Sequence, residues 1–396
     1  MKLFWPKDIG FDQAVELMRS KDTFTPFDEE VLLFTKALSK SLVRMRQMPE
    51  VVALGYWLRK ANIQDMKKKW EEQNKDRLIK PRGIVFHIAP SNVDTIFVYS
   101  WMLSLLAGNR NIIRISSKEQ KNELLDLILT EIAKPEFENI AKQTIICTYN
   151  YEENIGEQIS EICHTRVIWG GNDTVKTIRQ IPLNPMANEL AFPDRFSLAA
   201  LSAEAVMNMN DNDLDELLEK FYNDVFWFDQ MACSSPRLVV WCGKQIEKAK
   251  SRFWSAFENK IQKKQYELTA ASQVLKYTTS LWLATESEVK HIENSKYFSR
   301  IQVTDLPLEA RERHCGGGLF YEYEIESLPN LSKVILDKDQ TLAYFGFTHS
   351  ELELLVNSIS SRGLDRIVPI GQALNFDGVW DGQSFLKSFT REVVIL

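Results

Sequence analysis

The stretch GIVFHIAPSNVDTIFVYSWMLSLLAGNRNIIRI, residues 83–115, decides the fold class of this chain. It opens with a short apolar run at 84–88, typical of a buried strand, and continues with a long apolar run at 95–107, typical of a buried helix. A Gly-Asn pair ends that helix, and a second apolar strand follows at 111–115. A strand, a helix and a strand in this order predict a right-handed parallel crossover, the unit from which α/β sheets are built.

Beyond residue 115 the alternation of strands and helices continues along the chain. Apolar periodicity predicts, in order, a helix at 123–133, a strand at 143–147, a helix near 153–162, a strand at 165–169, a helix at 174–181, a strand at 196–202, a helix at 212–227 and a strand at 237–241. Ser117 and Gln120 form a capping-box pattern, which is expected to open the first of these helices. Because strands alternate with helices throughout, we predict an α/β protein with parallel sheets.

The region before residue 83 has a helical pattern instead. Apolar residues recur at helical spacing between Thr25 and about Gln73, and Thr25 followed by Pro26 is typical of an N-cap and a first-turn proline. Acidic residues at 28–30 suit the positive end of a helix. The sequence therefore predicts a helical cover that begins at Thr25.

Length and composition limit the class of protein. With 396 residues, of which 44% are hydrophobic, the chain can fill the cores of two domains, which excludes a disordered or fibrous protein. The formal net charge of -6 gives no sign of a nucleic-acid-binding surface. Neither a signal peptide nor a run of about 18 apolar residues is visible. We therefore expect a soluble cytoplasmic protein without a transmembrane segment, although peripheral membrane contact stays open.

Five cysteines occur without the CxxC spacing of a zinc site or the pattern of a disulfide framework, so we expect no metal site. Cys233 lies in the stretch WFDQMACSSPR, residues 227–237, between a predicted helix and a predicted strand. A cysteine here can be a small buried residue or a nucleophile that faces a cleft. Its polar neighbours argue against deep burial. Cys315 is a rival because it follows His314, but adjacent side chains usually point apart, and we read the three glycines after it as a flexible loop or a backbone approach to a ligand.

Two turns after predicted strands could also take part in chemistry. Asn92 follows the strand at 84–88, where its side-chain amide could donate to a developing oxyanion or could simply form an Asx turn that starts the helix. The Gly170-Gly171 pair follows the strand at 165–169 and precedes a helix. Such a turn can bring backbone N–H groups close to a phosphate, but two glycines are also common in ordinary turns. Each pattern is weak when it is taken alone.

Taken together, these segments resemble the aldehyde dehydrogenase superfamily and, more closely, its LuxC-type acyl-CoA reductase branch, the long-chain fatty acyl-CoA reductases. The resemblance runs from about Gly83 to Arg391. Its motifs, in chain order, are IAPSNVD, LAGNRNIIRISSK, VIWGGNDTV, DQMACSSPR, GLDRIVPIGQALNF and WDG. It implies an aldehyde-dehydrogenase-like α/β fold, with a Rossmann-type cofactor domain and a second α/β catalytic domain.

The resemblance also implies how the chain is divided. Residues 1–80 are expected to form a helical N-terminal region and residues 81–205 a dinucleotide-binding domain. Residues 206–345 are expected to form the catalytic domain that carries the thiol. The segment 346–396 is expected to return to the cofactor domain or to form an oligomer interface.

Carried over residue by residue, the resemblance makes Cys233 the nucleophile that accepts the acyl group. Asn92, together with the backbone N–H of Cys233, would hold the oxyanion of the thioester. Gly170 and Gly171 would lie at the cofactor pyrophosphate, although Val175 stands where the common G-x-T-x-x-G pattern has its last glycine. The motif DQMACSSPR also has two residues between its glutamine and its cysteine, which matches the LuxC branch and differs from the Gln-x-Cys of the wider superfamily.

The cofactor is expected from two further positions. Arg114 stands where the superfamily commonly has a lysine that reaches the adenosine ribose, and Ser117 stands where NAD-preferring members often have a glutamate. A guanidinium without a competing carboxylate suits a 2'-phosphate, so the resemblance favours NADPH over NADH.

The segment Glu189–Arg195 departs from the superfamily pattern. Hydrolytic members have a water-activating glutamate in a Glu-Leu-Gly-Gly-Lys segment, and the spacing places Ala191 at that position here. Glu189 or Asp194 could substitute in principle, but we assign the role to neither. A missing base suits a reductase, because the thioacyl-enzyme must survive until hydride arrives.

The resemblance implies NADPH-dependent reduction of a fatty acyl thioester to the aldehyde through a Cys233 thioacyl-enzyme. One alternative keeps the fold and takes the acyl group from an acyl phosphate, an acyl adenylate or an acyl-protein synthetase of the LuxE type. Another is a non-catalytic protein that binds an acyl carrier or acts as a scaffold. A homo-oligomer is expected from the resemblance, and the sequence identifies no general acid or base.

Overall fold

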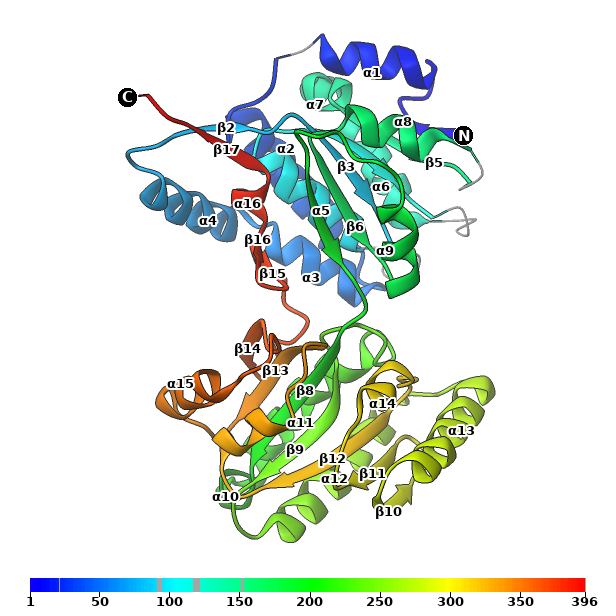
Figure 1. Cartoon of the computed structure of the whole chain (residues 1–396), viewed down its shortest axis with the longest axis vertical. Helices are drawn as coiled ribbons and strands as arrows, with labels where there is room; N and C mark the ends of the chain where they lie inside the picture. Colours follow the sequence, from blue (N-terminus) through cyan, green and yellow to red (C-terminus); the bar gives the residue numbers. More distant parts are fainter. Residues whose placement is uncertain (21, 91–94, 117–121, 151–152, 396) are drawn as a thin grey trace. The chain divides into compact units, whose positions relative to one another are not determined.

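The computed structural model of the chain describes residues 1–20, 22–90, 95–116, 122–150 and 153–395 (Figure 1). The chain forms two compact units. Unit 1 consists of Met1–Pro193 and Phe376–Leu396, and unit 2 consists of Asp194–Asn375. Each unit contains a largely parallel sheet covered by helices, so the predicted α/β class is confirmed.

The sheet of unit 1 has the strand order β1-β5-β4-β3-β6-β7. Its strands are β1 (Lys2–Trp5), β3 (Ile84–Ile88), β4 (Arg110–Arg114), β5 (Thr144–Thr148), β6 (Thr165–Trp169) and β7 (Asn188–Phe192). All neighbours are parallel except β1, which pairs antiparallel with β5. The chain places β4 and β5 on one side of β3 and then crosses back to place β6 on the other side. The order of the strands therefore reverses between β3 and β6, and at such a reversal an open α/β sheet leaves a crevice at its carboxyl edge.

The helices of unit 1 cover both faces of this sheet. They are α1 (Phe11–Arg19), α2 (Glu29–Leu42), α3 (Pro49–Trp57), α4 (Lys60–Gln73), α5 (Thr95–Leu106), α6 (Glu123–Ile132), the 3-10 turn η1 (Pro135–Phe137), α7 (Glu138–Lys142), α8 (Ile155–Ile162), α9 (Asn172–Arg179) and α16 (Phe385–Ser388). Alternate residues of β3, Ile84, Phe86 and Ile88, pack in one core with α1, α8 and α9. Both faces of β3 are buried, which is why the strand is an unbroken apolar run.

The C-terminal segment of the chain completes unit 1. It contains a short hairpin, β15 (Val379–Trp380) with β16 (Gln383–Ser384), and ends with β17 (Thr390–Val393). Figure 1 shows β17 beside β2 (Leu78–Pro81), with which it pairs antiparallel. The side chain of Asn109 donates to the carbonyl of Phe389 at 2.9 Å, so the C-terminal segment is also bonded to the turn before β4.

Two helix starts differ from the prediction. The predicted helical cover from Thr25 consists of the separate helices α2, α3 and α4, and the N-cap of α2 is Asp28, whose carboxylate accepts from the backbone N–H of Glu30 at 3.0 Å. Pro49 is the first residue of α3, a position at which a backbone N–H would have no partner within the helix. The N-cap of α6 is Asn122, whose side chain accepts from the N–H of Leu125 at 2.9 Å. The prediction that Ser117 opens this helix was therefore wrong.

The sheet of unit 2 has the strand order β10-β11-β12-β9-β8-β13-β14. Its strands are β8 (Phe196–Ser202), β9 (Pro236–Cys242), β10 (Val289–Asn294), β11 (Ser299–Val303), β12 (Leu319–Ile325), β13 (Asp339–Phe345) and β14 (Arg366–Pro369). Only the edge strand β10 is antiparallel to its neighbour. The helical elements are α10 (Ala203–Asn208), α11 (Asp211–Phe226), α12 (Ile246–Lys263), α13 (Ala270–Glu286), α14 (Leu308–Glu312), η2 (Leu328–Lys333) and α15 (His349–Ser358).

Successive residues of the central strands in unit 2 enter two different cores. Val239 and Trp241 of β9 pack with α11 and α12 on one face. Leu238 and Val240 of the same strand pack on the other face, where α13, α14 and α15 contribute side chains. Because side chains alternate across a strand, this double burial again requires continuous apolar runs.

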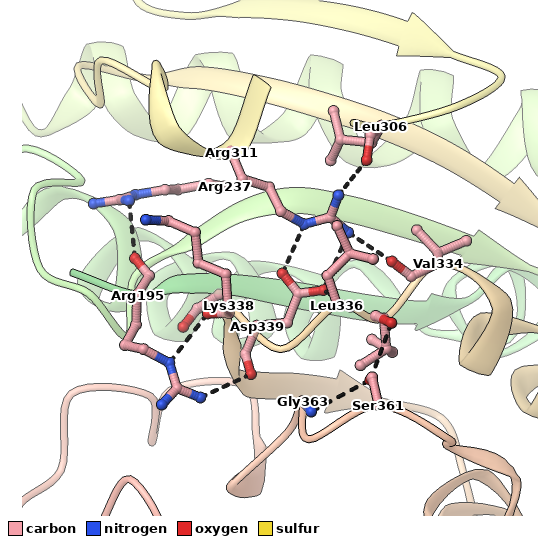
Figure 2. A network of polar contacts seen from close by, with 12 residues as sticks. Arg195, Arg237, Leu306, Arg311, Val334, Leu336, Lys338, Asp339, Ser361 and Gly363 are labelled. Atoms are coloured by element: carbon pink, nitrogen blue, oxygen red, sulfur yellow. Dashed lines mark hydrogen bonds and ion pairs between the residues drawn. The ribbon is translucent and has the colours of Figure 1, made fainter. Parts of the chain in front are cut away.

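A buried polar network ties together the first residues of the strands of unit 2 (Figure 2). Arg311 of α14 and Asp339 at the start of β13 form an ion pair in which both side chains have no exposed surface, with nitrogen-to-oxygen distances of 2.8 and 3.1 Å. Arg311 also donates to the carbonyls of Leu306 and Val334. Arg195, just before β8, donates to the carboxylate of Asp365 at 2.7 Å and to the carbonyl of Asp339 at 3.1 Å. The network fixes where these strands begin.

Within the described part of the chain, none of the helices has the length and apolar character needed to span a lipid bilayer.

Asp224 should make the stability of unit 2 depend on pH. This carboxyl group on α11 is 1% exposed and accepts from the N–H groups of Gly371 at 2.6 Å and Ala373 at 3.0 Å. Burial raises its pKa to about 7, although both bonds and the charge of Arg366 oppose the shift. Between about pH 4, where an unfolded aspartate ionises, and pH 7, the folded state retains a proton that the unfolded state has lost. Stability from this group therefore falls as pH rises through that window.

The test compares urea unfolding of the wild type and Asp224→Asn at pH 5.5 and pH 8. From pH 5.5 to pH 8, the free energy of unfolding of the wild type should fall by about 2 kcal/mol more than that of Asp224→Asn. Asp213→Asn, an exposed change on the same helix that leaves Asp224 in place, should keep the pH dependence of the wild type. Parallel pH profiles for the wild type and Asp224→Asn would refute the assignment.

Candidate functional site

The carboxyl edge of the unit 1 sheet contains most of the predicted cofactor positions. The Gly170-Gly171 turn follows β6, one of the two strands between which the strand order reverses. Arg114 is the last residue of β4. Asn92 and Ser117 themselves lie outside the described residues, which omit 91–94 and 117–121.

The two glycines differ in what surrounds them. A methyl group on Gly170 would approach the side chain of Thr174 to 2.9 Å, so the fold itself favours glycine there. A methyl group on Gly171 would meet nothing within 4 Å. Gly171 is also the N-cap of α9, where backbone N–H groups and the helix dipole favour negative charge. The open space above this helix start fits the close approach of a phosphate, although Asp173 in the first turn is an exposed negative charge.

Val175, which replaces the last glycine of the superfamily pattern, faces the core. Its side chain is 5% exposed and packs in the same cluster as Ile178 of α9. On the strand side of the turn, Trp169 stacks on Phe192 with ring centroids 4.0 Å apart. The Gly170-Gly171 turn, which lies between Trp169 and Val175 in the sequence, is therefore held by apolar packing on both sides.

Arg114 is buried, with 7% of its surface exposed. Its guanidinium lies over the ring of Tyr149 at 5.3 Å and reaches the carbonyl of that residue at 3.5 Å. A hydrogen bond of this length is weak, and the ring of Tyr149 adds a cation–π contact to it. The guanidinium is thus fixed at the carboxyl end of β4, beside the strand reversal.

The structure separates the five cysteines into two groups. None of them forms a disulfide bond, and Cys147, Cys163 and Cys242 are buried. Burial raises the pKa of the Cys147 and Cys163 thiols to about 12 and that of Cys242 to about 11, so these thiols are poor nucleophiles at neutral pH. Cys233 and Cys315 are half-buried, and both belong to unit 2.

Cys233 lies in the turn between α11 and β9, and two buried side chains fix this turn. The amide nitrogen of Gln230 donates to the carbonyls of Pro236 at 2.8 Å and Leu319 at 2.9 Å. The hydroxyl of Ser197 in β8 donates to the carbonyl of Cys233 at 2.6 Å. The cysteine is therefore tied to the starts of three parallel strands while its side chain stays half-exposed.

The three glycines after Cys315 pack against this turn. All three have left-handed backbone conformations. The N–H of Gly317 donates to the carbonyl of Asp229 at 2.8 Å, and a methyl group on Gly316 would lie 2.7 Å from the sulfur of Met231. The backbone of the glycine loop thus approaches the Cys233 turn closely.

His314 is not arranged as a base for Cys315. Its Nδ1 accepts from the N–H of Gly316 at 3.1 Å, so Nε2 carries the proton and donates to the carbonyl of Leu319 at 2.9 Å. Burial holds the pKa of His314 well below its usual value, so the ring is neutral. Both ring nitrogens hold the glycine loop in place.

Arg237 was missed by the reasoning from sequence, although it closes the quoted motif. It is the second residue of β9 and is 5% exposed. Its guanidinium donates to the carbonyl of Arg195 at 3.3 Å, as Figure 2 shows, and to the carbonyl of Met231 at 3.4 Å. A cation placed four residues after a candidate nucleophile was the available signal.

Both acidic residues near Ala191 are held in ion pairs. Glu189 of β7 pairs with Arg166 at 2.6 Å and with Arg179 at 2.8 Å. Asp194 pairs with Lys338 at 2.9 Å. Both carboxylates are thus engaged by cations in the folded protein.

Within the described ranges, no group of three or more His, Cys, Asp or Glu side chains could hold a metal ion.

Comparison with known proteins gives a family and a fold. The family model for acyl-CoA reductase (LuxC) matches residues 22–392. A search of curated proteins finds no match. A putative aldehyde dehydrogenase from Burkholderia cenocepacia has a TM-score of 0.65 at 14% identity, over 96% of this chain and 90% of that chain.

Two further aldehyde dehydrogenase structures are similar. Aldehyde dehydrogenase 21 from Physcomitrella patens has a TM-score of 0.67 at 12% identity, over 97% of this chain and 89% of that chain. The 1-pyrroline-5-carboxylate dehydrogenase from Thermus, solved with bound NAD, has a TM-score of 0.64 at 13% identity, over 98% of this chain and 86% of that chain. At these identities the likeness concerns the fold, and it confirms the predicted aldehyde-dehydrogenase-like architecture.

Proposed function

Because the chain belongs to the LuxC family of acyl-CoA reductases, we propose that it reduces a fatty acyl thioester to the aldehyde with NADPH through Cys233. The observation that carries the proposal is the turn of Cys233. This turn holds a half-buried cysteine just before a parallel strand, fixed by the buried side chains of Gln230 and Ser197. The three deeply buried thiols lack this combination.

In the proposed reaction the Cys233 thiolate attacks the carbonyl carbon of the acyl thioester. The new carbon–sulfur bond forms as the bond to the CoA sulfur breaks, and CoA leaves as its thiolate. The backbone N–H of Cys233 and the side chain of Asn92, a residue outside the described ranges, would donate to the oxyanion. NADPH held by unit 1 would supply hydride for the thioacyl carbon, and the resulting Cys233 thiohemiacetal would release the aldehyde and return the Cys233 thiolate.

The ion pairs of Glu189 and Asp194 support reduction over hydrolysis. A thioacyl-enzyme is lost to water when a nearby base activates that water. Here Ala191 occupies the position of the superfamily base, and the two flanking carboxylates are paired with Arg166, Arg179 and Lys338. These pairs favour a long-lived acyl-enzyme.

The cofactor proposal rests on unit 1. Gly170 and Gly171 would take the pyrophosphate at the start of α9, and Arg114, with Ser117, would accept the 2'-phosphate that distinguishes NADPH from NADH. The open space above Gly171 and the cation at the end of β4 both fit this group. Unit 1 would thus carry the cofactor and unit 2 the thiol.

Gly171→Ala should weaken cofactor binding without weakening the fold. The added methyl group would meet no protein atom within 4 Å, so the unfolding midpoint should stay unchanged. The same methyl group would occupy the space through which a phosphate approaches the backbone, and the dissociation constant of NADPH should rise about tenfold. Fluorescence titration with NADPH measures this constant.

Gly10→Ala is the matched control for that titration. Gly10 is the N-cap of α1, also in unit 1, and a methyl group there likewise meets nothing within 4 Å. Its φ of -74° is close to the -64° of Gly171. NADPH binding that is equal in the two variants would exclude the Gly171 turn as the pyrophosphate site.

The proposed function is tested by NADPH oxidation with a series of acyl-CoA chain lengths, with identification of the aldehyde product. NADH in the same assay tests the cofactor preference. Activity with acyl phosphates or adenylates, or only with an acyl-protein synthetase, would select the alternative donor. Failure to bind either nicotinamide cofactor would favour the non-catalytic alternative. Oligomerisation and a cytoplasmic location stay predictions.

A further inference from the structure

Arg237 is a buried cation that no carboxylate neutralises at close range. Its guanidinium is held by two backbone carbonyls, those of Arg195 and Met231, and its Nε has no hydrogen-bond partner in the described part of the chain. Among the residues that the structure describes, Arg237 forms no ion pair within 4.0 Å, whereas the neighbouring Arg195 and Arg311 each bind a carboxylate. A charge left in this state is costly, so its retention calls for an explanation.

Four groups from different elements raise the pKa of Arg237 through their charge. Asp194 precedes β8, Cys233 lies in the turn before β9, Tyr321 is in β12, and Cys315 lies in the glycine loop. Asp194 is already paired with Lys338, and burial raises the pKa of the Tyr321 hydroxyl, which therefore stays neutral. Of these four groups, the two thiols are those that remain to carry a negative charge opposite the cation.

Neutral and cationic neighbours complete the surroundings. His314 is neutral because it is buried. Lys276 of α13 interacts electrostatically with Cys315. Burial lowers the pKa of Lys276 to about 8 and that of Arg237 below its usual value. A guanidinium starts from so high a pKa that it remains charged at neutral pH.

We propose that Arg237 is a positioning residue that stabilises the thiolate of Cys233. The inference rests on the proposed function, in which this thiolate attacks the substrate. The guanidinium holds the carbonyl of Met231, two residues before the cysteine, so the cation and the thiol share one short turn. It acts through charge, and it touches no substrate.

Cys233 is favoured over Cys315 as the thiol that Arg237 serves. Burial is the largest influence on Cys315 and raises its pKa, and Thr279 and Lys276 face it from α13. Both thiols raise the pKa of Arg237 through their charge, and the effect of Cys233 is larger than that of Cys315. The hydrogen bond of Arg237 within the Cys233 turn has no counterpart to the backbone of Cys315 among the described contacts.

The charge changes how much nucleophile is present at neutral pH. An ordinary cysteine, with a pKa of about 8.5, is only a few per cent thiolate at pH 7. A cation beside the sulfur increases this fraction, as at other reactive cysteines near Arg or Lys. The effect needs no cofactor and no substrate, so it can be measured on the protein alone.

The experiment measures iodoacetamide labelling of Cys233 against pH in the full chain, read by peptide mass spectrometry in a Cys315→Ser background. The wild-type thiol should label with a midpoint below the ordinary value of about 8.5. Arg237→Met should move the midpoint upward and slow labelling at pH 7 about tenfold, whereas Arg237→Lys should keep most of the rate. Arg252→Met is the matched control, because Arg252 also donates to backbone carbonyls of unit 2, but those of Val206, Met207 and Met209 and not of the Cys233 turn.

An unchanged midpoint in folded Arg237→Met would overturn the inference. If that variant does not fold, a wild-type midpoint at or above the ordinary value overturns it equally. Failure of the proposed function has a different signature: acyl-CoA reduction is absent while the Cys233 midpoint is still low and still depends on Arg237. If the enzyme is active but the labelling midpoint of Cys233 is the same with and without Arg237, the inference is wrong and the proposed function stands.

Discussion

Replacement of Cys233 by alanine is expected to lower acyl-CoA-dependent NADPH oxidation by about 10⁴-fold or more, because the only step that forms the acyl-enzyme is lost. The unfolding midpoint should stay close to that of the wild type. The thiol is half-exposed, and the hydrogen bond that fixes this residue uses its backbone carbonyl and the hydroxyl of Ser197. Activity, the amount of acyl-enzyme by intact mass, and urea unfolding are the three measurements.

Cys315→Ala is the matched control for this experiment. Cys315 is the other half-buried thiol of unit 2, and its removal should leave acyl-enzyme formation intact. Turnover by Cys233→Ala together with inactivity of Cys315→Ala would transfer the nucleophile to Cys315. Turnover by both variants would exclude thiol catalysis at either position.

Arg311→Met is expected to produce the largest loss of stability, about 3–5 kcal/mol. The change leaves the carboxylate of Asp339 without its cation in a site where neither side chain has exposed surface. It also removes donors from the carbonyls of Leu306 and Val334. Because burial already raises the pKa of Asp339 and Arg311 opposes that rise, loss of the guanidinium should drive this carboxyl group toward its protonated form.

The measurement is urea unfolding of the full chain at pH 7. Asp339→Asn should also destabilise, and the double variant should lose less than the sum of the two single losses, because the partners interact directly. Lys220→Met is the comparison, since its pair with Glu216 is exposed, with side chains 51% and 68% accessible, and should contribute about 1 kcal/mol or less. A loss for Arg311→Met no larger than that of Lys220→Met would contradict a structural role for the network.

The central strands of both sheets could be predicted from the sequence because they are buried on two faces, whereas edge strands such as β1 and β10 were not predicted. The runs at 84–88, 165–169 and 196–202 coincide with β3, β6 and β8. Continuous apolar character marks such strands without any knowledge of their partners. The helix starts at Asp28 and Asn122 were misplaced because several residues near each start can cap a helix, and the choice depends on backbone geometry.

Part of the candidate site could also be predicted. The half-buried position of Cys233 agrees with its polar flanks, and the open space at Gly171 agrees with a turn that admits a ligand. The partners of these residues could not be predicted. Ser197 lies 36 positions from Cys233, and Gln230 binds Leu319 across 89 positions. Only the folded sheet brings such residues together.

Because the chain returns to unit 1 after Asn375, unit 1 can be completed only after unit 2 has been synthesised. Strand β2 is made before unit 2, whereas its antiparallel partner β17, in which Arg391 lies opposite Lys80, is made after it. All of unit 2 leaves the ribosome as one continuous segment between them, so it can close its core first. Until Phe389 and β17 have been made, Asn109 and the edge of β2 lack these contacts, so unit 1 closes after unit 2.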